Sequence, residues 1–330
     1  MNRAQHFVPQ ICLRPFHDPS LANEHVWVYK KGKSPRHAAV KKVAHQRDFY
    51  SFLHEGERNN LVDEYFQNLE GNRAGARLRQ LAETGRLSQE DKEFLAKFIG
   101  VMSARVPVAR ILADDIAGEK LTEELSKYVN DPELFEQQFK AVRLDPPMKS
   151  ETVRQMLLQG YRFQQADDFY NLQMMLDMAQ LNYEGLLDMD WIVWCASGDL
   201  QFITSDNPVV SILPQGGGEA RLGRSFSIPE IEIIFPLSPS ACLFARRGVA
   251  AGLRAAPNMR VRQVNKVLMG MAHRWIFAAE NSSKIARLFD RIGGTGGYGN
   301  DFYEYRPEIF QHKKSRREGE AQTSTALDET

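Results

Sequence analysis

The spacing of apolar and polar residues changes twice along the chain. Residues 1–56 contain a short alternating stretch, His25 to Lys30, that predicts a strand. Between residues 57 and 189 the apolar positions recur at helical spacing, and between residues 190 and 311 the pattern is that of short strands. We therefore predict an α+β fold with a central helical region, a mainly antiparallel C-terminal sheet and a short N-terminal strand segment.

Start and stop signals place several helices. Ser88 precedes a carboxylate-rich turn and an apolar stripe, which predicts a capped helix that stops at Pro107. Asp131 followed by a proline predicts the start of another helix. From Ser150 to Ala179 the apolar residues keep helical spacing, so this segment is expected to form one long helix or two coaxial ones.

The C-terminal region contains several short runs that predict strands. A hairpin is expected from Trp191 to Ser205, with its turn at Ser197–Asp199, and a second strand pair from Ile231 to Ala245. A helix from about Asn258 to Met271 and a last strand from Arg274 to Ala279 follow. These patterns divide the chain into four predicted segments. They are an N-terminal strand and loop segment (1–56), a helical region (57–189), a sheet region (190–311) and a disordered tail (312–330).

Composition is that of an ordinary soluble globular protein. Of the 330 residues, 43% are hydrophobic and 25% are charged, which favours a packed core over a disordered chain. The longest apolar run, Trp191 to Ala196, is far shorter than the ~20 residues of a membrane-spanning helix. Three widely spaced cysteines support neither a disulfide framework nor a zinc ribbon. We expect a cytoplasmic protein without a membrane partner.

The balance of 42 basic and 42 acidic residues conceals three charged zones. Residues 25–47 contain no acidic residue and seven Lys or Arg, and residues 241–291 contain ten Lys or Arg and two acidic residues. Residues 111–140 are strongly acidic. The basic zones, with Trp27 and Tyr29 in the first, suit a nucleic acid or nucleotide. Alternatively, the basic residues are solvated or pair with the acidic helices, and those helices could instead bind a protein partner.

Two short stretches carry candidate chemistry. Near the N-terminus, His6 could act as acid, base or metal ligand and Arg14 could hold an anion, or both could attach this segment to the body. At the end of a predicted strand, Asp206 could bind a divalent metal or act as a base, with Asn207 as a hydrogen-bonding neighbour. The same Ser-Asp-Asn-Pro sequence is also favourable turn chemistry.

The sequence resembles a bacterial family known as domain of unknown function 4238, over residues 6 to about 280. The resemblance rests on several segments, which are His6 to Phe16, Trp27 to Lys30, Val43–Ala44 with Asp48 to Tyr50, Asp63 to Glu70, Arg105-x-Pro107 and Phe202 to Pro208. It implies that the polar residues within these segments form one set: His6, Arg14, Asp48, Glu70, Arg105, Asp206 and Asn207.

We interpret this set as one cleft between the helical region and the sheet. His6, Glu70 and Asp206 would be the catalytic groups, with Glu70 and Asp206 holding Mg²⁺ or Mn²⁺. The substrate-binding groups, which would neutralise or hydrogen-bond a phosphate, would be Arg14, Lys42, Arg105 and Asn207. The hypothesis is a metal-dependent phosphodiester hydrolase, a nuclease or nucleotide hydrolase. The alternative is a non-catalytic module that binds nucleic acid, a nucleotide or a protein.

Overall fold

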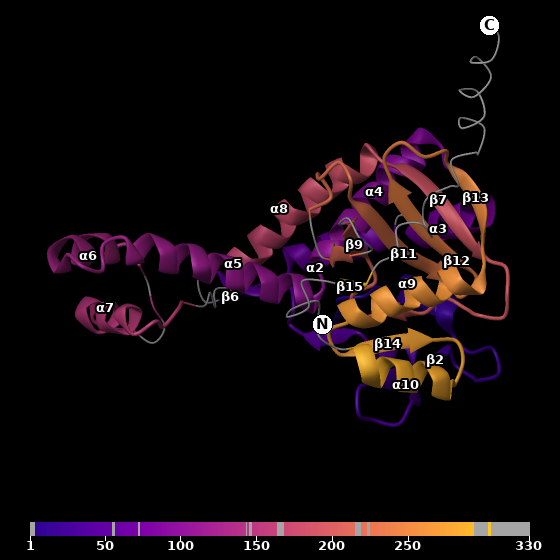
Figure 1. Cartoon of the computed structure of the whole chain (residues 1–330), viewed down its shortest axis with the longest axis horizontal. Helices are drawn as coiled ribbons and strands as arrows, with labels where there is room; N and C mark the ends of the chain where they lie inside the picture. The colour runs from indigo at the N-terminus through magenta and orange to yellow at the C-terminus, as the bar shows by residue number, and fades with distance from the viewer. Residues whose placement is uncertain are drawn as a thin grey trace, which may run out of the picture.

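The computed structural model describes most of the chain between residues 4 and 304. The described residues are 4–54, 57–71, 73–142, 144, 147–163, 168–214, 219–222, 225–293 and 303–304. The predicted tail, residues 312–330, lies outside them. The α+β prediction is confirmed, because strands from both ends of the chain frame a central series of helices (Figure 1).

The largest sheet has the strand order β13-β7-β12-β11-β9-β10-β15. Its strands are antiparallel except that β13 runs parallel to β7. The predicted pair at residues 231–245 is confirmed, with Ile234 opposite Phe244 in the register of β11 and β12. The strands are β7 (Asp190–Ala196), β9 (Val210–Pro214), β10 (Glu219–Leu222), β11 (Glu232–Ser238), β12 (Ala241–Arg246), β13 (Gly252–Ala256) and β15 (Tyr303–Glu304).

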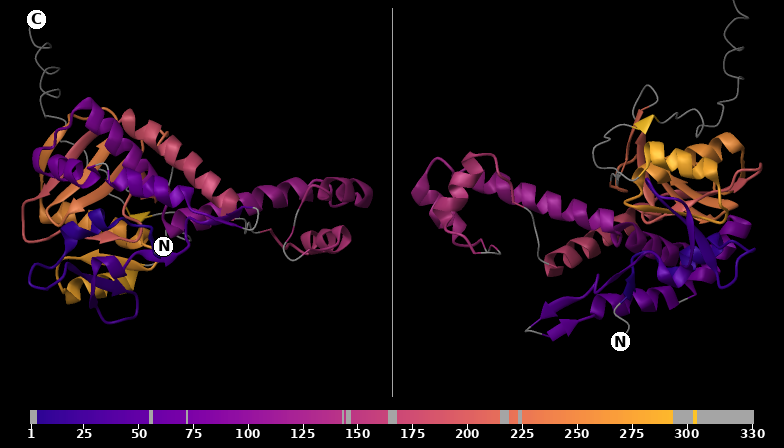
Figure 2. Two further views of the ribbon diagram at one scale, coloured as in Figure 1. Left: turned by 180° about the vertical axis from the view of Figure 1, so that it is seen from behind. Right: turned by 90° about the horizontal axis from the view of Figure 1, so that it is seen from below.

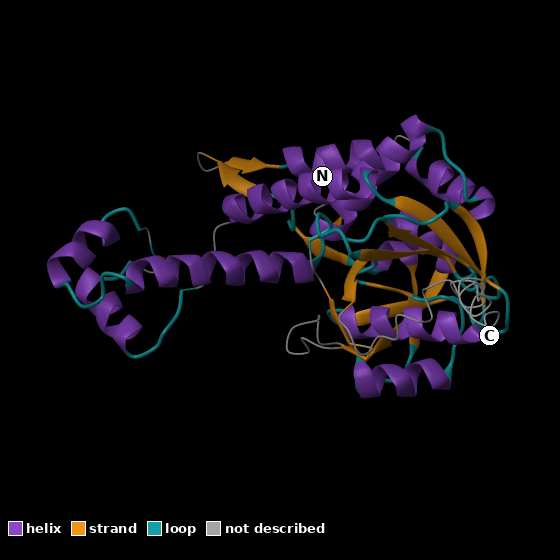
Figure 3. Cartoon of the chain, turned by 45° about the horizontal axis from the view of Figure 1, so that its top comes forward, coloured by secondary structure: helices purple, strands orange, loops and turns teal. Residues whose placement is uncertain are grey.

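The central strands of this sheet, β7, β9, β11 and β12, are buried on both faces. Because side chains alternate along a strand, Val193 and Leu243 face one core cluster, whereas Ile192 and Phe244 face the other. The first face is covered by α3 (Ala74–Thr84), α4 (Gln89–Ala104) and α8 (Asp168–Leu187) (Figure 3). The second face is covered by α9 (Asn258–Met271), beside which lies α10 (Ser283–Ile292). Two-sided burial explains why these strands are almost continuously apolar.

A second sheet joins the two ends of the chain. Its order is β3-β2-β14-β8, so the N-terminal strand lies between β3 and the late strand β14. Val28 is opposite Phe277, and Thr204 is opposite the same residue on its other side. The strands are β2 (His25–Lys30), β3 (Arg36–Ala39), β8 (Thr204–Ser205) and β14 (Trp275–Ala278). The N-terminal segment is therefore an integral part of the fold.

The remaining N-terminal elements are short. Strand β1 (Ala4–His6) pairs with β4 (His45–Arg47), and β5 (Phe52–His54) pairs with β6 (Glu57–Asn59). The helical turns are α1 (Gln10–Leu13), η1 (Arg14–Phe16) and η2 (Val40–Lys42). Strand β5 also contacts α8.

The helical start signals are confirmed. The Ser88 hydroxyl accepts from the backbone N–H of Asp91, and the Asp131 carboxylate accepts from two backbone N–H groups at the start of the next helix. Helix α4 ends at Ala104, and α5 begins directly at Pro107. The helices of this region that lie outside the sheet-covering layer are α2 (Leu61–Gly71), α5 (Pro107–Ser126), α6 (Pro132–Phe139) and α7 (Ser150–Leu158).

The distal half of α5 projects from the body as an arm that carries α6 and α7 (Figure 2). We call residues 115–163 the helical arm. Its tip has a core of its own, in which Leu125 and Val153 pack against the stacked rings of Phe135 and Phe139. The arm carries most of the acidic zone away from the basic C-terminal region, so the acidic helices do not cover that region within one chain.

Two predictions of local structure are wrong. Strand β7 pairs with β12 and β13, whereas β8 pairs with β14 in the other sheet, so Trp191 to Ser205 is no hairpin. The segment from Ser150 to Ala179 is not one coaxial helix: α7 packs on α6 in the arm, whereas α8 packs on α4 in the body. Strands β7 and β8 and helix α8 pack on elements distant in the sequence, whereas α7 packs on α6, the helix that precedes it. In the described part of the chain, none of the helices combines the length and apolar character needed to cross a membrane.

Candidate functional site

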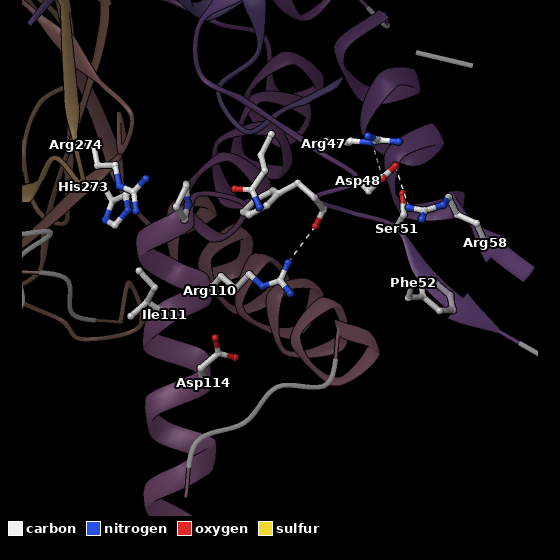
Figure 4. Close-up of a pocket in the computed structure, with 13 residues that line it drawn as sticks. Arg47, Asp48, Ser51, Phe52, Arg58, Arg110, Ile111, Asp114, His273 and Arg274 are labelled. Carbon is white, nitrogen blue, oxygen red and sulfur yellow. Dashed lines mark hydrogen bonds and ion pairs between the residues drawn. The ribbon is translucent and has the colours of Figure 1, made fainter. Parts of the chain in front are cut away.

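A pocket of about 560 Å³ lies where the N-terminal segment, the start of α5 and the α9–β14 connection meet (Figure 4). We call it the arginine pocket, because four arginines reach it from three separate parts of the chain. The side chains that line it are Gln46, Arg47, Asp48, Phe49, Ser51, Phe52, Arg58, Pro107, Arg110, Ile111, Asp114, His273 and Arg274. Three segments that carry the family resemblance contribute to its walls or support them.

The first wall is the turn after α9, and Asp206 holds it in place. The buried Asp206 carboxylate accepts hydrogen bonds from the backbone N–H groups of His273, Arg274 and Trp275 at 2.8, 2.7 and 2.9 Å. The neighbouring Asn207 side-chain amide donates to the carbonyl of Met271 at 3.0 Å. Asp206 and Asn207 therefore act behind the wall, where they orient the turn that presents the His273 and Arg274 side chains.

The second wall surrounds Asp48, whose φ of 54° is in the left-handed region that an aspartate tolerates better than most residues. Its carboxylate forms ion pairs with Arg58 at 2.9 Å and with Arg47 at 3.4 Å. Both arginines are more exposed than the aspartate. This wall therefore carries a net positive charge at its rim.

The third wall is the first turns of α5. Pro107 starts the helix, a position where the missing N–H of proline costs nothing. Arg110, one turn further on, donates to the carbonyl of Phe49 at 3.3 Å and lies over the Phe49 ring at 5.5 Å from its centroid. Asp114 follows on the same helix face, one more turn away. Helix α5 thus adds one cation and one carboxylate to the pocket.

The electrostatics of the pocket suit an anion. Burial, assisted by the adjacent Arg274 charge, lowers the pKa of His273 below its ordinary value, so the imidazole is neutral near pH 7. With His273 neutral, the lining carries four arginines against two aspartates. Guanidinium groups bind phosphate or carboxylate through paired hydrogen bonds. A neutral imidazole in the same pocket can accept a proton from a bound hydroxyl or water.

The predicted residues Glu70 and Arg105 are joined in a buried network outside the lining of the arginine pocket. Arg105 donates to the Glu70 carboxylate at 2.7 Å and to the Tyr50 hydroxyl at 3.1 Å, and also donates to the carbonyl of His6. The Tyr50 hydroxyl donates back to the Arg105 carbonyl at 2.9 Å. The guanidinium also lies 4.5 Å from the centroid of the Phe66 ring. This network connects the N-terminal segment with α2 and α4, which is the structural role that such residues commonly have.

His6 lies beside this network. Burial, the neighbouring His45 and the Arg105 charge lower the pKa of His6 to about 4. Its ring makes an edge contact with His45 at 5.3 Å and a hydrogen-bonding contact with the Gln10 amide at 3.3 Å. The His6 side chain is not among the groups that line the arginine pocket.

The other predicted phosphate ligands lie apart from the arginine pocket. Arg14 forms an ion pair with Glu24 at 3.2 Å, beside a different depression near α3. Lys42 is exposed on the turn before β4. The structure therefore brings His6, Glu70 and Arg105 together in one place, holds Asp206 and Asn207 together in another, and keeps Arg14 and Lys42 separate from both.

The predicted metal ligands, Glu70 and Asp206, are each engaged with donors of the protein itself. Among the residues that the structure describes, no three His, Cys, Asp or Glu side chains are grouped closely enough to hold a metal ion. The predicted trio of His6, Glu70 and Asp206 is accordingly not assembled as a ligand set in the described chain.

Sequence reasoning missed most of the pocket lining. Arg47 and Arg274 lie in the two basic zones of the sequence and Asp48 lies in a segment of the family resemblance, but Arg58 and Arg110 lie in stretches whose local pattern marks no site. The available signal was indirect: Arg58 and Arg110 lie within ten residues of segments that carry the family resemblance, whereas Arg274 lies in the basic zone of residues 241–291. A polar residue in such a segment can act by positioning its neighbour, as Asp206 positions Arg274.

The pocket electrostatics give a direct prediction for His273. Replacing Arg274 with glutamine removes the adjacent positive charge, so we expect the pKa of His273 to rise toward its ordinary value of 6.5 while remaining below it, because burial persists. NMR titration of the His273 ring protons measures this shift. Arg262→Gln, an exposed change elsewhere on the protein, is the control and should leave the titration unchanged. An unaltered His273 titration in Arg274→Gln would contradict the described wall.

Comparison with known proteins gives a family and no named relative. A family model described as "Protein of unknown function (DUF4238)" matches residues 4–282. No curated protein and no solved structure matches the chain. The matched range contains the helical arm and every residue of the arginine pocket. It also contains every strand of the described sheets apart from β15. The chain therefore belongs to the DUF4238 family.

Proposed function

We propose that the protein binds a phosphate-bearing ligand, a nucleotide or nucleic acid, in the arginine pocket. The observation that carries this proposal is the convergence of Arg47, Arg58, Arg110 and Arg274 on one pocket of about 560 Å³. A volume of this size is within the range of small-molecule sites. Arginine is the side chain best suited to bind phosphate oxygens in a fixed geometry.

Support also comes from the way the pocket is held. Arg110 is held against Phe49, and the backbone of Arg274 is held by its hydrogen bond to Asp206. Ligand binding costs less when the binding groups are ordered before the ligand arrives. The partly buried Phe52 ring adds apolar lining on which a nucleobase could stack.

Binding of nucleoside mono-, di- and triphosphates by isothermal titration calorimetry tests the proposal. We expect Arg274→Gln to weaken nucleotide binding at least about tenfold, because a charge-assisted hydrogen bond contributes roughly 1.5–3 kcal/mol. Arg86→Gln, which changes an exposed arginine away from the pocket, is the matched control. Equal affinities of wild type and Arg274→Gln, or no binding of any nucleotide or oligonucleotide by wild type, would refute the proposed function.

Hydrolysis of a bound phosphodiester is the second candidate. The observation that favours it is the presence of the neutral His273 imidazole and the carboxylates of Asp48 and Asp114 in the same pocket as the arginines. The imidazole could accept a proton from water, and the arginines could stabilise charge on the phosphate. Mg²⁺ or Mn²⁺ would have to be held by pocket carboxylates together with substrate oxygens.

Cleavage assays on DNA, RNA and nucleotides, with and without Mg²⁺ or Mn²⁺, separate the two candidates. A hydrolase should lose most of its activity in His273→Gln while retaining nucleotide affinity. If His273→Gln and wild type cleave equally, or if neither cleaves any substrate that the pocket binds, the hydrolase candidate fails and the binding proposal is unaffected.

A further inference from the structure

A second basic site lies between α9 and α10. This groove, of about 500 Å³, is lined by one apolar residue, Leu288, and otherwise only by cations. We call it the basic groove. Its cationic side chains are Arg262, Lys266, Lys284, Arg287 and Arg291. It shares no lining residue with the arginine pocket.

The cations form two rows. Arg262 and Lys266 are one turn apart on α9, and Lys284, Arg287 and Arg291 lie at helical spacing along one side of α10. Helices α9 and α10 contact each other, so the two rows of cations border the groove on opposite sides. Along α10 the row extends roughly 10 Å, whereas a nucleic acid strand in a duplex carries one charge about every 3.4 Å. The groove therefore matches several successive phosphates.

None of these five cations forms an ion pair with another residue that the structure describes. The one nearby carboxylate on α10, Asp290, accepts from the backbone N–H of Gly32 instead and does not line the groove. Five cations held side by side repel one another, so the concentration of charge favours a polyanion.

The groove runs beside the body of α9, and the arginine pocket lies just beyond its C-terminal end. Arg262 and Lys266 are in the body of this helix, and His273 and Arg274 follow its last residue, Met271, directly. The distance along the helix from Arg262 to its end is roughly 14 Å at 1.5 Å per residue. One flexible polyanionic strand could therefore reach both sites.

We infer that the basic groove holds the phosphate backbone of a nucleic acid strand whose terminal or central nucleotide lies in the arginine pocket. This inference rests on the proposed function and makes it more specific, because the ligand becomes a polynucleotide. The groove contributes affinity without base selectivity, since its groups are point charges and guanidinium forks with no aromatic side chain beside them.

The competing occupant is the acidic helical arm of a second copy. The arm extends away from α9 and α10 of its own chain, so only a different molecule could bring it to the groove (Figures 1 and 2). A nucleic acid strand is favoured because the arm pairs part of its charge internally, as in the Glu151–Arg154 and Glu124–Lys127 pairs, whereas phosphates have only mobile counterions to release.

The test compares a mononucleotide, a dinucleotide and a twelve-residue oligothymidylate by fluorescence anisotropy or calorimetry at several salt concentrations. The variant is Lys284→Glu/Arg287→Glu, and the matched control, with the same charge change at exposed positions, is Arg86→Glu/Lys120→Glu. We expect the groove variant to lose at least about tenfold in affinity for the oligomer. Its salt slope should fall by about 1.4, because each contact to a single strand contributes about 0.7.

Mononucleotide affinity should be the same in the groove variant and in wild type, which separates this inference from the function of the pocket. An unchanged oligomer affinity and salt slope in the groove variant would overturn the inference and leave pocket binding intact. Concentration-dependent self-association of wild type in sedimentation velocity without nucleic acid, abolished by the groove variant, would also overturn it in favour of the arm. Circular dichroism and thermal melting establish that both variants are folded.

Discussion

Replacing Arg105 with leucine is expected to lower the free energy of unfolding by about 3–5 kcal/mol, the usual cost of removing one partner of a buried ion pair. Only 3% of the Arg105 side chain is exposed, and it satisfies Glu70, the Tyr50 hydroxyl and the His6 carbonyl together. Leucine leaves the carboxylate and the carbonyl without their donor. Urea denaturation at neutral pH, monitored by circular dichroism, measures the change.

The matched control is Arg86→Leu, an exposed arginine for which we expect a change within about 0.5 kcal/mol. Arg105→Lys should give an intermediate loss, because lysine keeps the charge but lacks the planar fork that reaches three acceptors. If Arg105→Leu unfolds at the same urea concentration as Arg86→Leu, the buried network does not stabilise the N-terminal segment.

Replacing Asp206 with alanine is expected to cost at least about 3 kcal/mol of stability, because three backbone N–H groups lose their acceptor in a buried position. The change should also weaken nucleotide binding, since Asp206 orients the turn that carries His273 and Arg274. Both effects are measured on one sample, by urea denaturation and by calorimetry. An Asp206→Ala protein that is less stable but binds nucleotides normally would show that the turn keeps its shape without the carboxylate.

The pH dependence of the Asp206 contribution has a definite sign. Burial raises the pKa of Asp206 from 3.8 to about 6, although the three backbone donors act in the opposite direction. Between pH 3.8 and about pH 6, the folded state binds a proton at Asp206 more readily than the unfolded state does. The contribution of Asp206 to the free energy of unfolding therefore decreases as the pH rises through this range. The stability advantage of wild type over Asp206→Asn should therefore be larger at pH 4 than at pH 6.5. An advantage that increases over this range would contradict the raised pKa.

The candidate site shows what a family resemblance can and cannot indicate about residues. The segments around Asp48, Arg105 and Asp206 each border the arginine pocket or support its walls. The polar residues predicted from these segments, such as Arg105, Asp206 and Asn207, mostly form hydrogen bonds within the protein behind the pocket. Of the arginines that reach the pocket itself, Arg110 follows Arg105 by five positions, whereas Arg274 is distant from Asp206 in the sequence and meets it only in the fold.

The sequence by itself determined the secondary structure where the cause is local. A cap at Ser88, a proline at Pro107 and the helix of residues 258–271 follow from hydrogen bonding and side-chain spacing within a few residues, and the structure confirms them. Uneven charge is also a property of the sequence, so the basic zones and the acidic segment could be recognised before any fold was known.

Only the tertiary structure decided how these pieces combine. The pairing of β2 with β14 joins residues about 250 positions apart, and it is selected by burial on both faces of a sheet, which no local pattern encodes. The same long-range packing gathers arginines from residues 47, 58, 110 and 274 into one pocket. It also places the acidic arm away from α9 and α10. Although the net charge of the sequence is zero, the fold therefore has a basic groove and a separate acidic arm.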